Sequence, residues 1–162
     1  MKASLTSHLK ICGKRPMRQK KQENAIRDLL SSHYQKAGSV CDYPSLGEYQ
    51  DNKYHSLKDS GGTRGFIDFV VRVSDCLVCV EVDEQQHRRN DAAKEITRMA
   101  MLAAVLNQKS ELPIRWIRFN PDAHHVDGKL VKVSRLARHA RLIGEIELGL
   151  SGSPVTYLYY DH

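Results

Sequence analysis

Three acidic residues lie in two apolar stretches of the sequence, with a spacing suited to binding a divalent cation. Asp68 interrupts an apolar stretch, and Glu81 and Asp83 alternate with valines in the next one. If the two stretches are paired strands, residues two apart share a face, so the three carboxylates can converge. Carboxylates among apolar residues are costly unless a cation or hydrogen bonds satisfy them. We therefore predict that Asp68, Glu81 and Asp83 hold Mg²⁺ or Mn²⁺.

Other polar residues lie close enough in the sequence to join this predicted site. His87 follows Asp83 by four residues, and a histidine there is suited to exchanging a proton with water. Glu23 reaches the cation only if the first predicted helix packs against the two strands. The alternative is that His87 is a surface histidine in a turn and Glu23 a solvated acid near a helix start.

The order of predicted elements indicates one α/β domain over residues 18–162. A helix is expected first, ended by Gly38, and then a long loop rich in Gly, Ser and Asp with room for one short strand. The two acidic stretches are expected to form a hairpin. The predicted ranges are helices over 18–37, 90–109 and 133–150, a loop over 42–64, and strands over 65–73, 77–84, 114–119 and 155–160.

Basic residues are concentrated near the amino-terminal end. Residues 1–22 contain seven of the 25 Lys and Arg and none of the 19 Asp and Glu, so the net charge of +6 arises there. A basic arm over 1–17 is suited to nucleic-acid phosphates, although a solvated tail has the same composition. The residues predicted to contact phosphates are Lys14, Arg15, Arg18, Lys20, Lys21, Arg88, Arg89 and Arg118.

The chain lacks the apolar windows of a secretory signal or a transmembrane span. An intracellular protein is therefore expected, with no membrane partner. The basic arm is also compatible with an organellar presequence or a nuclear targeting signal, and the sequence does not separate these compartments.

The cysteines and the larger aromatic residues are expected to be structural. Cys76 and Cys79 have a zinc-like spacing, but on a strand they point to opposite faces, so buried reduced cysteines are predicted. Trp116 and the tyrosines at 157, 159 and 160 occupy strand positions, where core packing is more common than stacking on bases. The pair His124 and His125 is assigned no metal.

The element order and the acidic positions together resemble the PD-(D/E)XK restriction-endonuclease-like superfamily, in the branch similar to very-short-patch mismatch-repair endonucleases. The matching residues, between positions 20 and 122, are Glu23, Asp68, Glu81, Asp83, Gln86, His87, Glu95, Arg98, Arg118, Phe119 and Asn120. The resemblance implies a central mixed sheet of four to five strands flanked by helices, in the order α-β-β-β-α-β, with a C-terminal helix and strand. It also implies Mg²⁺- or Mn²⁺-dependent hydrolysis of phosphodiester bonds in DNA.

One position departs from the superfamily pattern, because Asp83 stands where the signature has lysine. That lysine normally neutralises charge and orients the attacking water. The resemblance then implies that His87 assists the water or the leaving phosphate. Gln86 becomes a polar positioning residue and Glu23 a further catalytic acid.

Three functional classes follow from these observations. The first is a metal-dependent endonuclease acting on DNA, with RNA not excluded, as a homodimer or within a larger nucleic-acid-processing complex. The alternative is a catalytically inactive nuclease fold that binds nucleic acid or serves as a subunit, which the missing lysine favours. The third is a hydrolase of another phosphoester or a structural partner protein, since fold does not dictate function.

Overall fold

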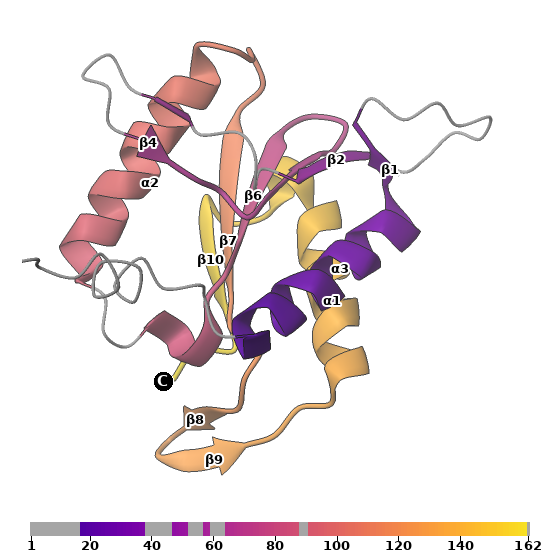
Figure 1. Cartoon of the computed structure of the whole chain (residues 1–162), viewed down its shortest axis with the longest axis vertical. Helices are drawn as coiled ribbons and strands as arrows, with labels where there is room; N and C mark the ends of the chain where they lie inside the picture. Colours follow the sequence, from indigo (N-terminus) through magenta and orange to yellow (C-terminus); the bar gives the residue numbers. More distant parts are fainter. Residues whose placement is uncertain (1–16, 38–46, 52–56, 59–63, 88–90, 162) are drawn as a thin grey trace, which may run out of the picture.

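A mixed β-sheet forms the centre of the protein in its computed structural model, which describes residues 17–37, 47–51, 57–58, 64–87 and 91–161 (Figure 1). Within these residues, six strands lie side by side in the order β1-β2-β5-β6-β7-β10. They are β1 (Gln35–Lys36), β2 (Glu48–Asp51), β5 (Phe69–Arg72), β6 (Leu77–Val82), β7 (Ile114–Phe119) and β10 (Val155–Leu158). The pairings from β2 through β5 to β6 are antiparallel, whereas β6, β7 and β10 run parallel. The chain is therefore an α/β protein.

Helices cover both faces of this sheet (Figure 1). They are α1 (Met17–His33), α2 (Ala92–Asn107) and α3 (Arg135–Glu147), with short turns η2 (Glu84–His87) and η3 (Gly149–Ser151). Ile26 of α1 and Leu142 of α3 share one buried core with Val80, whereas Leu102 of α2 shares a second core with Cys79. Residues two apart on a strand point to the same face, so Glu81, two residues after Cys79, lies on the face covered by α2. None of the helices in the described segments is long and apolar enough to span a bilayer.

Most of the predicted elements are confirmed. The expected helices over 90–109 and 133–150 are α2 and α3, and the expected strands over 77–84, 114–119 and 155–160 are β6, β7 and β10. The short strand allowed within the long loop is β2. The hairpin of acidic strands is present as β5 and β6, paired in antiparallel register.

Three local predictions were wrong at the ends of elements. The first helix stops at His33 because the next residues extend, and the N–H of Gln35 donates to the carbonyl of Gly47 at 3.0 Å. This adds β1, so the sheet has six strands rather than four to five. The expected strand over 65–73 is divided, because β4 (Arg64–Gly65) pairs with β3 (Leu57–Lys58) outside the main sheet.

A second small hairpin, β8 (His124–Val126) with β9 (Lys129–Val131), was not predicted. Asp127 and Gly128 connect its strands with φ values of 50° and 73°. Such left-handed residues at both central positions suit a tight two-residue hairpin turn. Figure 1 shows this hairpin projecting away from the main sheet, before α3 begins.

The buried residues include the cysteines and the tryptophan, as expected. Cys76 and Cys79 are free thiols and lie in the two different cores, one on each face of the sheet. Trp116 is buried in the α2-side core. The prediction of reduced, structural cysteines is therefore confirmed for these two positions, and Cys12 and Cys41 lie outside the described residues.

The buried guanidinium of Arg115 joins β7 to α3 and to the start of β10. It donates to the Ser153 carbonyl at 2.6 Å and to the Glu145 carbonyl at 2.7 Å, and it pairs with the Glu145 carboxylate. A Cβ atom built on Gly152 would overlap this guanidinium. A side chain at position 152 would therefore have to displace this buried, hydrogen-bonded guanidinium.

Gly152→Ala is expected to reduce the free energy of unfolding by about 2 kcal/mol, since overpacking displaces a buried, hydrogen-bonded group. Urea unfolding followed by circular dichroism measures the change. The matched control is Gly144→Ala in α3, where a Cβ meets no atom within 4 Å. That change should stabilise by about 0.5–1 kcal/mol through helix propensity. Equal effects of the two substitutions would contradict the packing argument.

Candidate active site

Asp68 and Glu81 lie opposite one another where β5 begins and β6 ends. The register pairs Phe69 with Val80, and continuing it by one position sets Asp68 against Glu81. Residues directly opposite in an antiparallel pair share a face, here the face covered by α2. The N–H of Val82 donates to Oδ2 of Asp68 at 2.9 Å, which fixes this carboxylate beside β6.

The Glu81 carboxyl is buried and only partly neutralised. Nη1 of Arg98 donates to its Oε1 at 3.0 Å. Burial, followed by the negative charge of Asp68, nevertheless raises the pKa of Glu81 to about 7, although Arg98 lowers it. Ionisation of Glu81 is therefore unfavourable even with Arg98 bound, and an additional cation beside this carboxyl would favour its charged form.

Asp83 turns toward β7 and the carboxyl-terminal segment. Nε and Nη2 of Arg118 donate to its two oxygens, the second bond at 2.8 Å, and the Tyr160 hydroxyl also donates to it. Asp83 is 0% exposed and Arg118 is 4% exposed. Burial, followed by the charge of Asp83, raises the pKa of the Tyr160 phenol, so this donor stays protonated. Asp83 is thus anchored by two partners that the sequence did not indicate.

The three carboxylates predicted to share a cation have different hydrogen-bond partners. Asp83 is nevertheless close enough for its charge to add to burial and to the charge of Asp68 in raising the pKa of Glu81. The role of Asp83 as a metal ligand stays a prediction. Among the described residues, no group of three or more His, Cys, Asp or Glu side chains has the arrangement of a metal site. The structure brings Asp68 and Glu81 together and directs Asp83 to Arg118. Arg118 was expected to be exposed and to contact phosphates, but it is buried. It pairs in register with Glu81, so its side chain lies on the face covered by α2.

Glu95 of α2 connects the two arginines into one network. Its Oε2 accepts from Nη2 of Arg98 at 3.1 Å and from Nη1 of Arg118 at 2.9 Å. Burial works against ionisation of Glu95, yet these hydrogen bonds and charges hold its pKa below the usual value. Acids and arginines therefore alternate from Glu81 to Asp83. The spacing of Glu95 and Arg98, three residues apart on a helix that follows β6, was the available signal for this network.

The turn η2 positions Gln86 against the end of the chain. Gln85 and Gln86 have φ values of 54° and 57°, a left-handed conformation that is unfavourable for residues with a side chain. The turn is held because the Gln86 amide donates to Asp161 at 2.6 Å and accepts from the Asp161 N–H at 2.9 Å. Gln86 is thus a positioning residue for this turn. His87 ends the turn, and its side chain lies outside the description.

Glu23 lies on the opposite side of the sheet from Asp68 and Glu81. It is buried in α1, where Arg27 donates to it at 3.4 Å, and Arg27 itself lies 5.7 Å from the ring centre of Phe69. Phe69 belongs to the core shared by α1 and α3. The structure therefore does not bring Glu23 to the face on which the acidic pair lies, and its catalytic role stays a prediction.

Most of the predicted phosphate contacts fall outside the description. Lys21 is exposed on α1. Arg18 and Lys20 lie in α1, but their side chains are not described, and Lys14, Arg15, Arg88 and Arg89 lie outside the described residues. The basic arm over 1–17 is likewise outside them, apart from Met17, so its role stays a prediction.

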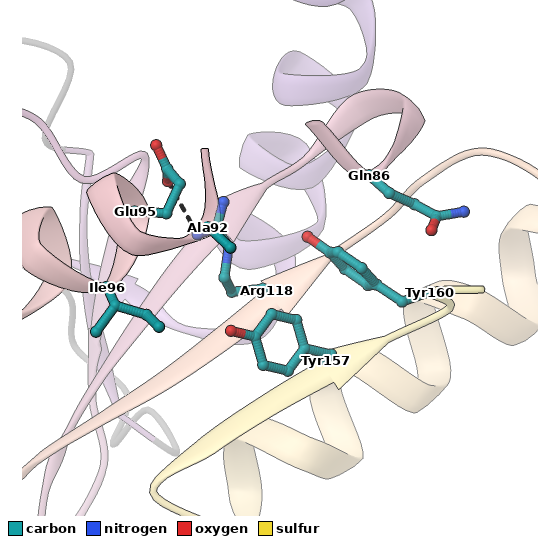
Figure 2. A pocket seen from close by; sticks show the side chains of 7 residues that line it. All are labelled: Gln86, Ala92, Glu95, Ile96, Arg118, Tyr157 and Tyr160. Atoms are coloured by element: carbon teal, nitrogen blue, oxygen red, sulfur yellow. Dashed lines mark hydrogen bonds and ion pairs between the residues drawn. The ribbon is translucent and has the colours of Figure 1, made fainter. Parts of the chain in front are cut away.

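A small cavity lies between α2 and the carboxyl-terminal segment, next to the ion-pair network. Its volume is about 150 Å³, and Figure 2 shows Arg118 of β7 between the α2 residues and the tyrosines. The lining residues are Gln86, Ala92, Glu95, Ile96, Arg118, Tyr157 and Tyr160.

Comparison of the chain with protein-family models, with curated proteins and with solved structures gives no match. The geometry of the site is accordingly the basis for its function.

Proposed function

We propose that this chain is a divalent-cation-dependent endonuclease that hydrolyses phosphodiester bonds in DNA. The observation that carries the proposal is the Asp68–Glu81 pair, in which burial and the charge of Asp68 raise the pKa of Glu81 to about 7. A buried carboxyl with a raised pKa, directly opposite a second carboxylate on the neighbouring strand, has the electrostatics of a cation site.

The donor set fits Mg²⁺ or Mn²⁺. Magnesium is commonly held by one or two carboxylates, completed by water and substrate phosphates. Arg98 binds Oε1 of Glu81, and the described residues make no hydrogen bond to Oε2. A bound cation would neutralise charge on the phosphate and lower the pKa of a water. Asp68 and Glu81 are the residues that would hold it.

Other residues of the chain would hold this pair in place. Arg98 donates to the Phe66 carbonyl at 2.9 Å as well as to Glu81, so it fixes the approach to Asp68. The Asp83–Arg118 pair ties the end of β6 to β7, and we assign Asp83 this positioning role. His87, the last residue of the turn anchored by Gln86, is the residue proposed to take the proton of the attacking water.

The arrangement of the elements supports a restriction-endonuclease-like core. Leaving the two-residue strands aside, the order α1, β2, β5, β6, α2, β7 follows the pattern α-β-β-β-α-β, with an antiparallel β2-β5-β6 meander and a parallel β7. In this proposal the basic arm and Arg88 and Arg89 contact substrate phosphates, which makes the affinity fall as salt rises.

The deciding experiment compares nicking of supercoiled DNA, and cleavage of RNA, with Mg²⁺, with Mn²⁺ and with EDTA. Asp68→Asn should reduce the cleavage rate by about a hundredfold or more, because a neutral amide binds the cation poorly while still accepting from Val82. Asp127→Asn, in the exposed β8–β9 turn, is the matched control and should cleave normally. Cleavage that persists in Asp68→Asn, or that is absent with both cations, would refute the proposal.

A second candidate, a nucleic-acid-binding protein without cleavage, is favoured by one observation. The position at which the superfamily signature has lysine holds Asp83, which is committed to Arg118 and Tyr160. This candidate predicts binding that weakens with salt and that is indifferent to divalent cations and to Asp68→Asn.

A further inference from the structure

The cavity beside the ion-pair network is a slot with apolar and aromatic walls. Ala92 and Ile96, from the first turns of α2, form one wall, and Tyr157 and Tyr160 form the other (Figure 2). Glu95 and Arg118 contribute charged groups to its lining. We call these six residues the tyrosine slot.

Two large side chains of the tyrosine slot are unusually exposed. Ile96 is 62% exposed and Tyr157 is 47% exposed, whereas Leu158, the next residue of β10, is 6% exposed. The expectation that Tyr157 packs in the core was therefore wrong. Apolar groups that face solvent on both sides of a hollow are characteristic of a binding surface.

The aromatic wall consists of the exposed ring of Tyr157 packed against the anchored ring of Tyr160. The rings of Tyr157 and Tyr160 meet edge to face, with their centres 5.1 Å apart and their planes at 80°. Tyr160 is in turn fixed by its hydroxyl, which donates to the buried Asp83. A fixed aromatic ring binds a planar group at low entropic cost, because little side-chain freedom is lost on binding.

The size and the polar groups of the slot restrict its ligand. A volume of about 150 Å³ is below the roughly 300–1,000 Å³ of sites for drug-sized molecules, so it suits one ring system. The charged groups of Glu95 and Arg118 lie beside the apolar walls, where they are held by the ion-pair network. Stacking surfaces with polar groups at one edge are what enzymes use to hold a base removed from its stack.

The slot also adjoins the proposed cleavage site. Arg118 of the slot donates to Asp83 and to Glu95. Glu95 in turn accepts from Arg98, which donates to Glu81. A base held between Ile96 and Tyr157 would therefore lie on the same face of the sheet as the Asp68–Glu81 pair.

We infer that the tyrosine slot binds a single unpaired nucleobase, so that the substrate class is nucleic acid with an extrahelical or single-stranded base. The inference rests on the proposed function, and it adds a base-binding site to the cleavage site. It assigns Tyr157 as the stacking residue and Ala92 and Ile96 as the opposing wall.

The test measures binding in EDTA, where divalent cations do not contribute. The probe is a DNA duplex with 2-aminopurine either unpaired in a bulge or paired in an otherwise identical duplex. The wild-type protein should prefer the bulged DNA by about tenfold and change its fluorescence, since stacking on an aromatic side chain strengthens binding. Tyr157→Ala should bring the preference to within about twofold and leave affinity for the paired duplex unchanged.

Three further variants make the assignment specific. Tyr157→Phe keeps the ring and should keep the preference. Ala92→Phe fills the slot from the helix side and should abolish it. Leu136→Ala removes a side chain that is 81% exposed on α3, on the other face of the sheet, and should behave as wild type.

Equal affinity of the wild-type protein for the two DNAs, or binding to neither, would overturn the inference. A preference that survives in both Tyr157→Ala and Ala92→Phe would do the same. Cleavage in Mg²⁺ is assayed separately. A bulge preference without cleavage supports the slot and rejects the nuclease, whereas cleavage without the preference rejects the slot alone.

Discussion

Arg118→Met is expected to reduce the free energy of unfolding by about 3–5 kcal/mol at neutral pH, because it leaves a buried carboxylate without its charged partner. Asp83 is wholly buried, and Arg118 supplies hydrogen bonds to both of its oxygens. The same change removes a donor from Glu95. Urea unfolding at several protein concentrations, followed by circular dichroism, measures the loss.

Two controls separate this pair from arginine pairs in general. Arg141 pairs with Glu145 at 3.1 Å but is mostly exposed, so Arg141→Met should cost at most about 1 kcal/mol. The double variant Asp83→Leu with Arg118→Met removes both buried charges and should recover more than half of the loss. If Arg118→Met is no more harmful than Arg141→Met, the pair does not anchor β6 to β7.

This anchor also explains why Asp83 differs from Asp68 and Glu81, although all three are acids at strand ends. Asp83 has an arginine and a tyrosine fixed on its two oxygens, whereas Glu81 accepts from Arg98 through Oε1 and Asp68 accepts from the N–H of Val82. Burial and the charge of Asp68 raise the pKa of Glu81 despite Arg98. In the proposed function, a cation is therefore expected at this end of the network.

Local patterns in the sequence were sufficient for the main elements of the fold. The alternation of apolar and polar residues in β7 and the helical period of α2 each specify an element without help from distant residues. The weaker elements depend on tertiary contacts. The pairing of β1 with β2 ends the first helix, and the β8–β9 hairpin is too short to show a period.

The candidate site was predictable to the extent that it depends on strand register. The pairing of Asp68 with Glu81 follows from the period of two residues in adjacent strands. The surroundings of Asp83 did not follow, because Arg118 and Tyr160 come from distant positions in the sequence and reach it only through the parallel packing of β7 and β10. The face occupied by Glu23 likewise depended on which side of the sheet α1 covers.

Glu81→Gln is expected to remove a pH dependence of stability in the metal-free protein. The pKa of Glu81 rises from 4.5 to about 7 on folding. A carboxyl with a raised pKa in the folded state contributes stability that is complete below pH 4.5 and is lost as the pH rises through about 7. This loss amounts to roughly 3 kcal/mol in the wild-type protein. Unfolding by urea between pH 4.5 and pH 8 measures it.

In Glu81→Gln the carboxyl is absent, so that loss should disappear, while Glu111→Gln, at an exposed glutamate, should follow the wild-type curve. Addition of Mg²⁺ or Mn²⁺ at pH 8 should restore stability to the wild-type protein, because a cation bound only by the folded state stabilises it. It should leave Glu81→Gln unchanged. Binding should weaken as the pH falls below about 7, since protons then compete with the cation for Glu81. Equal stabilisation of both proteins would place the cation elsewhere.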